Sequence, residues 1–239
     1  MANDTGDIAE KLVMPTGFSS VEAADEVAKR LQQAGYDANE LPLVATGYGR
    51  IAVPYANKVV TEITCHARGA WALFAEDGTV VDVGGQDTKA IGLASGKVRK
   101  FVMNDKCSAG TGRFLEIMAD RLGVSQQELA RLAAAGQPTV ISNMCTVFAE
   151  SEVISYMGEG KEKDEIAAGG INSVAVKVVA LMQRKELMDT VIVTGGLSDN
   201  QFFAKLLSEK LHREVLPMEN GRYAGAYGAA ILAREKLGR

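Results

Sequence analysis

Two apolar strands that each run into a pair of glycines constrain the fold more than any other feature of this sequence. They are VVDVGGQD at residues 80–87 and VIVTGGLSDN at residues 191–200. Continuous β-branched runs are typical of strands covered on both faces. Glycines at the end of such a strand allow positive φ and let main-chain amides approach a phosphate with no Cβ in the way. A single pair is more often an ordinary tight turn, but two favour a phosphate-binding protein.

The rest of the chain alternates strands with helices. The pattern predicts strands at 10–14, 41–46, 79–83, 88–93, 98–103, 190–194 and 214–216. It predicts helices at 21–33, 57–75, 148–157, 165–185, 202–211 and 223–237, with two more built around Phe114 and Leu129. The closing helix starts with AGAYGAAILA, whose small residues allow very close packing against another backbone. This alternation, with one hairpin at Ser95 and Gly96, indicates an α/β fold of two lobes, here divided as residues 1–104 and 105–239.

Composition excludes several classes of protein. The 239 residues carry 26 Lys and Arg against 30 Asp and Glu, a formal net charge of -4, which disfavours a nucleic-acid partner. Apolar runs are interrupted before the roughly 20 residues needed to cross a bilayer, so no membrane partner is expected. The polar start MANDTGD does not resemble a signal peptide. We therefore expect a cytoplasmic protein, in which 3 cysteines do not form a disulfide framework.

Two carboxylates flank the first glycine pair. Asp82 precedes Gly84 and Gly85, and Asp87 follows Gln86. A carboxylate at a strand end beside a phosphate loop can hold Mg²⁺ through water or orient an attacking water. Neither glycine turn matches a P-loop or a dinucleotide fingerprint, so both of those assignments are disfavoured.

Cys107 and Cys145 both lie shortly before predicted helix starts, where the helix dipole favours a thiolate or an anionic ligand. Buried structural thiols are the plainer alternative. The sequence has no CxxC pair, so one chain cannot supply a standard four-cysteine site. Two chains could do so at a twofold axis. Cys65 lies inside a predicted helix, so we expect its thiol to be packed in the core. We expect its neighbour His66 to have a structural role.

Several motifs together resemble a known family, the ATP-dependent activators of 2-hydroxyacyl-CoA dehydratases and the related ATPase subunits of benzoyl-CoA reductases. In chain order they are ATGYGR, EITCHARGA, VDVGGQDTK, MNDKCSAGTGRFLE, CTVFAESEVIS, VTGGLSDN and GAYGAA. The resemblance runs from about Leu12 to the C-terminus. It implies an actin, hexokinase and heat-shock-70-like two-lobed ATPase fold with ribonuclease-H-like halves.

The resemblance also implies site residues and partners. Cys107 and Cys145 would be ligands of one four-iron four-sulfur cluster held between the subunits of a homodimer. The second phosphate motif would comprise the catalytic residues Asp82, Gln86 and Asp87 with Gly84 and Gly85, and the adenosine motif Gly195 and Gly196. ATP hydrolysis with Mg²⁺, leaving ADP, would drive one low-potential electron into the dehydratase or reductase of an anaerobic pathway of CoA esters. A ferredoxin or flavodoxin would be the donor.

The start of the chain departs from this family pattern. Family members open with a hairpin carrying an Asp-Gly-Ser-Thr-Lys type loop, and residues 1–11 have no equivalent. Three explanations are open: a start codon assigned too late or a trimmed sequence, a variant that binds nucleotide weakly without turnover, or a complementing segment from another chain. We favour the first. We expect the chain as written to hydrolyse ATP poorly.

Two functions from other classes stay open. A small-molecule kinase of the same superfamily would use an Asp as base and give the two cysteines no role, so it would survive their replacement by serine. A non-hydrolysing regulatory remnant would show no ATP turnover coupled to reduction of a partner.

Overall fold

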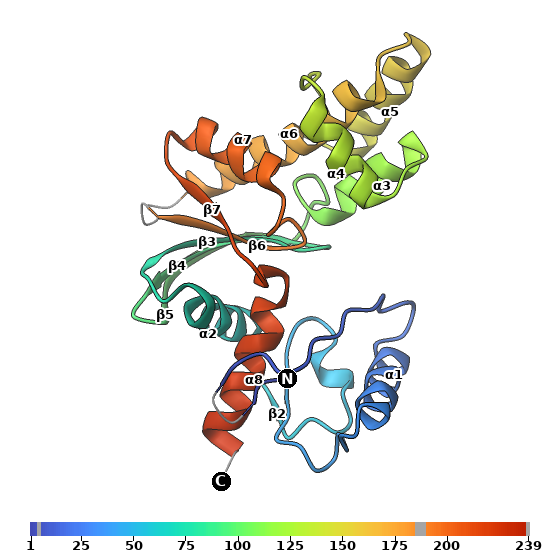
Figure 1. Ribbon diagram of the computed structural model, residues 1–239. Helices are drawn as coiled ribbons and strands as arrows, with labels where there is room; N and C mark the ends of the chain where they lie inside the picture. The colour runs from blue at the N-terminus through green and yellow to red at the C-terminus, as the bar shows by residue number, and fades with distance from the viewer. Residues whose placement is uncertain (4–5, 185–189, 238–239) are drawn as a thin grey trace. The chain divides into compact units, whose positions relative to one another are not determined.

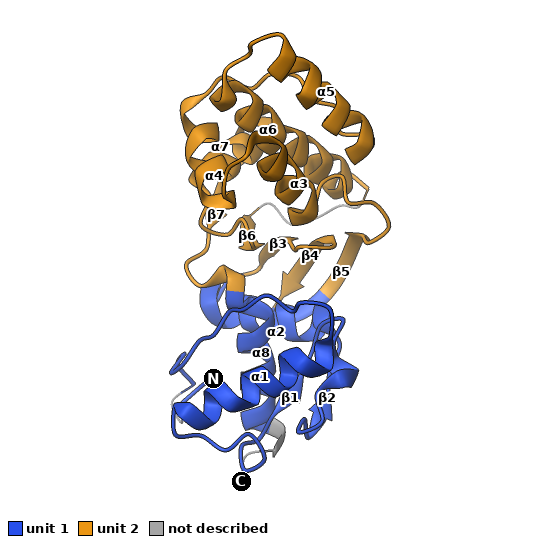
Figure 2. Cartoon of the chain, turned by 90° about the vertical axis from the view of Figure 1, so that its right-hand side faces the viewer, with its two compact units in different colours: residues 1–76, 95–98, 223–239 blue, residues 77–94, 99–222 orange. Residues whose placement is uncertain are grey.

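The computed structural model describes residues 1–3, 6–184 and 190–237. The chain forms two compact units, drawn in different colours in Figure 2. Unit 1 comprises residues 1–76, 95–98 and 223–239, and unit 2 comprises residues 77–94 and 99–222. The predicted N-terminal lobe, residues 1–104, contributes to both units, and its boundary stays a prediction.

Helices are the main regular structure in the described part of unit 1. Its elements are α1 (Ser20–Gln33), β1 (Val44–Ala45), the 3-10 turn η1 (Arg50–Ala52), β2 (Lys58–Val59), α2 (Glu62–Phe74) and α8 (Ala224–Leu237). β1 and β2 pair in parallel. The predicted strand at 10–14 was wrong, because these residues form no β-structure. Close by, Ala2 and Ile8 form an isolated antiparallel β-bridge. The predicted helix at 57–75 begins later because Lys58 and Val59 pair with β1 instead.

Helices α2 and α8 pack backbone against backbone, as the small residues of α8 predicted. A Cβ built on Gly228 would lie 1.7 Å from the carbonyl oxygen of Cys65, and one on Gly69 would lie 1.8 Å from that of Ala224. Only glycine permits this approach at the two positions. Cys65 is fully buried among Val44, Ala229 and Leu232, which confirms the packed thiol.

Unit 2 is built on a five-stranded sheet. Its strands are β3 (Gly78–Val83), β4 (Thr88–Ala94), β5 (Lys97–Asn104, starting in unit 1), β6 (Val191–Gly195) and β7 (Val215–Pro217), in the order β5-β4-β3-β6-β7. β3 and β4 are antiparallel, whereas β6 is parallel to both β3 and β7. A three-strand meander followed by two parallel strands is the predicted ribonuclease-H-like half. β3 is buried along its whole length.

Five helices complete the described part of unit 2, and Figure 1 shows α6 and α7 beside the sheet. They are α3 (Gly112–Leu122), α4 (Gln126–Ala135), α5 (Thr146–Gly158), α6 (Lys163–Met182) and α7 (Gln201–Leu211); the 3-10 turn η2 (Gly221–Tyr223) leads into α8. The predicted end of α6 at Lys185 lies outside the described residues. Within the described residues α6 is the one helix whose length and composition would suit a membrane span. It lies in the core of unit 2, which accounts for that composition.

Candidate functional site

The two glycine turns lie at the same edge of the sheet of unit 2. β3 and β6 are parallel neighbours with Asp82 opposite Thr194 and Val83 opposite Gly195. The Gly196 amide donates to the Val83 carbonyl over 3.0 Å, which ties the second turn to the end of β3. In open α/β sheets the carboxyl ends of such strands are where ligands bind.

Gly195 requires glycine on two grounds. Its φ of 77° lies in the left-handed region, and an added Cβ would lie 2.5 Å from the Val83 carbonyl oxygen and 2.6 Å from Asp82 Oδ1. Gly84, Gly85 and Gly196 do not use this freedom, because their φ angles lie outside that region. Gly85 is exposed, and a Cβ built on it would have nothing within 4 Å. The first turn therefore leaves room beside its backbone for a ligand.

The predicted carboxylates Asp82 and Asp87 come together at this edge, around a lysine that sequence reasoning missed. Lys89 Nζ lies 2.5 Å from Asp87 Oδ1 and 3.6 Å from Asp82 Oδ2, and all three side chains are buried. Thr194, on β6, donates to Asp82 Oδ1 over 3.4 Å. Gln86, between the glycine pair and Asp87, is exposed to solvent.

A signal for Lys89 was present in the sequence. It is the one charged residue of β4, and it follows Asp87 by two positions, a spacing that favours the same face of an extended segment.

Asp82 and Asp87 fit a divalent cation by their chemistry. A carboxylate oxygen of Asp82 lies within 4.8 Å of a carboxylate oxygen of Asp87. Carboxylate oxygens are the ligands that Mg²⁺ prefers. Mg²⁺ usually keeps several waters and binds one or two carboxylates together with substrate phosphates. A buried pair beside an open glycine turn matches this description.

The segments that carry Cys107 and Cys145 are joined by a side-chain hydrogen bond. Ser108 Oγ and Thr146 Oγ1, each the residue after a cysteine, lie 2.8 Å apart. Cys145 lies immediately before α5, as predicted, and is itself the N-cap residue of that helix. Cys107 lies in the loop before α3, which starts at Gly112 after its N-cap Thr111, and this confirms its predicted place shortly before a helix. The two cysteines are therefore presented from neighbouring segments of one unit.

Asn104 braces the loop of Cys107. Its side-chain amide donates to the carbonyl oxygens of Cys107 at 2.9 Å and Ala109 at 3.1 Å. Both Cys107 and Cys145 are half-buried, whereas Cys65 is fully buried in unit 1. Two accessible thiols per chain fit a four-thiolate cluster shared by two chains.

The first glycine turn contacts the start of α3 directly. The amides of Gly112 and Arg113 donate to the carbonyl oxygens of Gly84 and Gly85 over 2.8 and 2.9 Å. These are the first amides of the helix, which have no acceptor within it. The turn that would face phosphate is thus hydrogen-bonded to the start of the helix that directly follows the loop of Cys107.

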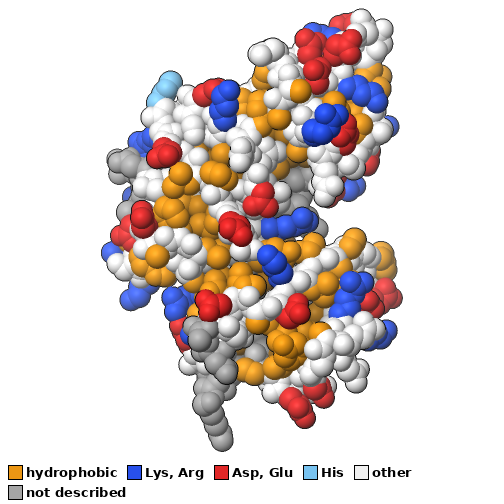
Figure 3. All heavy atoms as spheres, in the orientation of Figure 1, with side chains coloured by type: hydrophobic (Ala, Val, Ile, Leu, Met, Phe, Trp, Pro, Cys, Tyr) orange, Lys and Arg blue, Asp and Glu red, His pale blue; other side chains and the backbone are white. Residues whose placement is uncertain are grey.

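One helix beside the cysteines exposes apolar side chains. Val147, Phe148, Ile154 and Met157 of α5 are 43–64% exposed, and Met144, just before Cys145, is 70% exposed. Charged side chains of both signs are mixed over the helical end of unit 2 in Figure 3. An exposed apolar patch of this kind marks an interaction surface.

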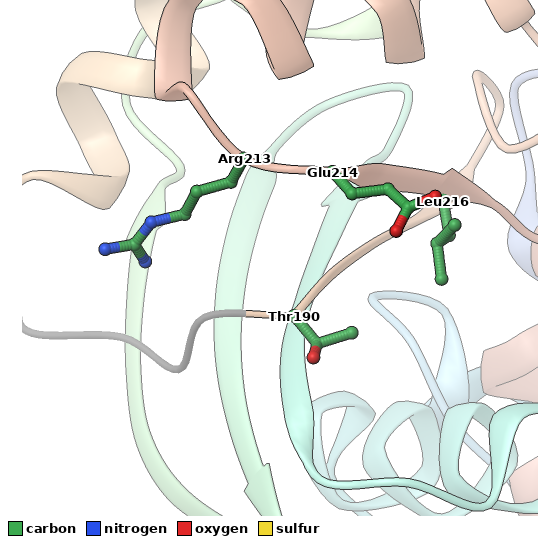
Figure 4. A pocket seen from close by; sticks show the side chains of 4 residues that line it. All are labelled: Thr190, Arg213, Glu214 and Leu216. Carbon is green, nitrogen blue, oxygen red and sulfur yellow. The ribbon is translucent and has the colours of Figure 1, made fainter.

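A pocket of about 280 Å³ lies elsewhere on unit 2, lined by Thr190, Arg213, Glu214 and Leu216. Figure 4 shows the Arg213 side chain pointing away from that of Glu214. Thr190 immediately precedes β6, so the pocket is at the opposite end of this strand from Gly195. It is separate from the glycine turns and from the cysteine loops.

Known proteins resemble this chain over most of its length. It is 39% identical over 239 residues to the (R)-2-hydroxyglutaryl-CoA dehydratase activating ATPase of Acidaminococcus fermentans, covering 99% of this chain and 92% of that protein. It is 33% identical over 220 residues to one of the subunits of the benzoyl-CoA reductase of Thauera aromatica, covering 87% of this chain and 78% of that protein.

Solved structures give the same result. The activator of the 2-hydroxyisocaproyl-CoA dehydratase from Clostridium difficile, with bound ADPNP, superposes with a TM-score of 0.91 at 34% identity, over 98% of this chain and 89% of that one. An ethanolamine utilization protein, EutJ, from Carboxydothermus hydrogenoformans and a glucokinase of the ROK family from Streptomyces griseus share the fold alone, with TM-scores of 0.57 and 0.56 at 18% and 16% identity. They cover 89% and 98% of this chain, and 73% and 94% of their own. These neighbours confirm the predicted actin, hexokinase and heat-shock-70-like fold.

The match to a family description spans nearly the whole chain, residues 1–233, and so includes both glycine turns and both cysteine loops. The chain belongs to the BadF/BadG/BcrA/BcrD ATPase family.

Proposed function

We propose that this protein is an ATPase that delivers one low-potential electron to a 2-hydroxyacyl-CoA dehydratase and so activates it. The observation that carries the proposal is the hydrogen bond between Ser108 and Thr146, which brings the segments of Cys107 and Cys145 together. Paired half-buried thiols have no role in nucleotide hydrolysis by itself. They suit a metal centre, and its chemistry in this proposal is one-electron transfer by a four-iron four-sulfur cluster.

The nucleotide side of the mechanism rests on the sheet edge. Asp82 and Asp87 would hold Mg²⁺ and orient the attacking water, and the exposed amide of Gln86 is available to the same water. The turn at Gly84 and Gly85 would receive the phosphates, and the turn at Gly195 and Gly196 the adenosine part. Hydrolysis would leave ADP and phosphate against these groups.

A route from nucleotide to thiols follows from the contacts of α3. A shift of the first turn on loss of the terminal phosphate would move the acceptors of the Gly112 and Arg113 amides. The loop from Asn104 to Thr111 is joined to the same helix end, so the surroundings of Cys107 would change with it. Hydrogen bonding and solvent exposure around a cluster set its reduction potential.

Two copies of the chain would complete the metal site. Each contributes Cys107 and Cys145, and the exposed apolar residues of α5 follow Cys145 in the sequence. A twofold axis through this region would cover the apolar side chains and supply four thiolates. Such a site is oxygen-sensitive and suits a cytoplasmic protein of an anaerobe, reduced by a ferredoxin or flavodoxin.

The first test is a count of iron and acid-labile sulfide in protein purified without oxygen. We expect about four of each per dimer, lost in both Cys107→Ala and Cys145→Ala. Cys65→Ala is the matched control because Cys65 is packed in unit 1, and it should retain the full count. Metal-free protein after careful reconstitution would contradict the proposal.

A second candidate is the ATPase subunit of an aryl-CoA reductase, and the 33% identity to a benzoyl-CoA reductase subunit favours it. Reduction of purified partner enzymes separates the two, because only the true partner would accept electrons with ATP turnover. A kinase or a non-hydrolysing remnant would behave differently. Cys107→Ser with Cys145→Ser would leave a kinase active, and a remnant would show no turnover at all.

A further inference from the structure

One side of α6 contacts both segments that carry the proposed cluster ligands. Its residues Glu165, Gly169, Ser173 and Lys177 follow one another at intervals of four, a spacing that places them along one side of a helix. These four residues are called the α6 stripe below. Because α6 lies in the core of unit 2, the stripe offers a fixed support to the loops beside it.

The first half of the α6 stripe holds the segment that leads to α5. The carbonyl oxygen of Glu165 accepts from the Thr139 amide over 3.2 Å. A Cβ built on Gly169 would lie 2.4 Å from the Thr139 carbonyl oxygen, so a larger residue would push this segment away. The segment therefore lies against the backbone of the helix.

Ser142, three residues before Cys145, is held at both of its main-chain groups. Its carbonyl oxygen accepts from Oγ of Ser173 over 3.2 Å, and Ser173 is 3% exposed. Its amide donates to Glu152 Oε2, on α5, over 2.6 Å. The backbone that precedes Cys145 is thus anchored to two helices.

The last residue of the α6 stripe, Lys177, packs against the loop of Cys107. Gly110 is buried with a φ of 88°, and a Cβ built on it would lie 2.5 Å from Cγ and 2.8 Å from Cβ of Lys177. The aliphatic stem of the lysine makes this contact. The Gly110 carbonyl oxygen also accepts from Oγ1 of Thr88 over 2.6 Å. Gly110 is therefore held between α6 and β4.

The anchors of the two segments differ in their relation to the nucleotide site. Ser173 and Glu152 are far in sequence from both glycine turns. Thr88 is the first residue of β4 and directly follows Asp87, a residue of the proposed nucleotide site. A movement of the first turn would therefore act on Gly110, and so on the loop of Cys107, through one hydrogen bond.

We propose that Ser173, Thr88 and Lys177 are positioning residues for the two thiols. Ser173 fixes the segment of Cys145 to α6, whereas Thr88 and Lys177 hold the loop of Cys107 against the strand that follows the first glycine turn. The inference rests on the proposed function and deepens it. It gives the two cluster ligands separate supports, and one support is shared with the nucleotide site.

The test measures alkylation of each cysteine by N-ethylmaleimide in the full-length, reduced, metal-free protein, resolved by peptide mass spectrometry. Ser173→Ala should raise the rate at Cys145 about 5-fold, the effect of one ordinary hydrogen bond on a local opening equilibrium. Thr88→Val should raise the rate at Cys107 by a similar factor. The other cysteine should respond less in each variant.

Matched variants separate positioning from general stability. Thr88→Ser keeps the hydroxyl and should leave the rate at Cys107 near the parental value. Lys177→Ala should raise that rate, whereas Lys177→Met keeps the stem and should not. Ser208→Ala, in α7, removes another part-buried hydroxyl that is hydrogen-bonded to the main chain. It should lower the thermal midpoint as Ser173→Ala does, with both cysteine rates unchanged.

A second measurement uses protein loaded with iron and sulfide. Ser173→Ala and Thr88→Val should lose iron to a chelator about 10-fold faster, the lower end of the range for residues that support metal ligands. Thr88→Ser and Ser208→Ala should lose iron at the parental rate.

The two measurements distinguish this inference from the proposed function. Alkylation needs no cluster, so a parent protein that holds no iron would refute the proposed function alone. Parental alkylation rates in Ser173→Ala and Thr88→Val would overturn the positioning role. So would equal acceleration at both cysteines, or acceleration by Ser208→Ala or Lys177→Met.

Discussion

The two units reach stability by different means. Unit 2 has a core of large side chains between its sheet and helices, with Phe114, Met118 and Phe203 almost inaccessible to solvent. The hydrophobic cluster of unit 1 is small and made of Val44, Cys65, Ala229, Leu232 and Ala233 with Val60 against it. Unit 1 instead brings two helix backbones into contact at Gly69 and Gly228. Side-chain volume dominates in one unit and close backbone approach in the other.

This difference also places the chemistry. The long, buried strands of unit 2 hold Asp82, Lys89 and Gly195 in register, whereas the strands of unit 1 are only two residues long. Large apolar residues of unit 1 are left exposed, including Phe18 at 105% and Ile51 at 86%. A site that needs side chains fixed to fractions of an ångström is better supported by a sheet with a deep core.

The largest effect is expected from truncating the core of unit 2. Phe114→Ala removes a ring that is 0% exposed, and it should lower the free energy of unfolding by about 3–5 kcal/mol. Urea unfolding at constant m-value measures it. Leu232→Ala in the smaller core of unit 1 should lower the free energy of unfolding by less, about 2 kcal/mol. A loss equal to that of Phe114→Ala would contradict the view that side-chain packing dominates only in unit 2.

A single added methyl group tests the backbone contact of unit 1. Gly228→Ala would place a Cβ 1.7 Å from a main-chain oxygen, so the helices must separate, at a cost of about 2–3 kcal/mol. The matched control is Gly170→Ala in α6 of unit 2, where the nearest atom is Met118 Cγ at 3.6 Å. That change should be neutral or stabilise by up to about 1 kcal/mol, since alanine favours helix. Equal destabilisation by both would contradict close backbone packing as the feature of unit 1.

The smallest losses of stability are expected from removing helix N-caps, which stabilise both units in the same way. Asn200 accepts from the Phe203 amide over 2.9 Å at the start of α7, and Ser19 accepts from the Glu22 amide over 3.3 Å at the start of α1. Asn200→Ala should cost about 1 kcal/mol and Ser19→Ala about 0.5 kcal/mol, because the shorter bond is part-buried. Thermal unfolding of both variants checks the order, and a larger loss in Ser19→Ala would reverse it.

Local patterns predicted most of unit 2 and less of unit 1. β3, β4 and β6 were predicted within one residue because continuous β-branched or apolar runs identify a buried strand. The strand predicted at 10–14 was wrong, since a short segment with three apolar residues becomes a strand only if a partner strand lies beside it. Similarly, the start of α2 was misplaced because Val59 found a partner in β1.

The sequence by itself determined the glycine turns, the carboxylates Asp82 and Asp87 near them, and the family, because these lie in contiguous motifs. Only the tertiary structure decided that Lys89 joins the two carboxylates, that Ser108 meets Thr146, and that the Gly84 carbonyl caps α3. The last two contacts join residues far apart in the chain, and Lys89 owes its place to strand register. Strand pairing and core packing set such contacts, and no short-range pattern of residue types encodes them.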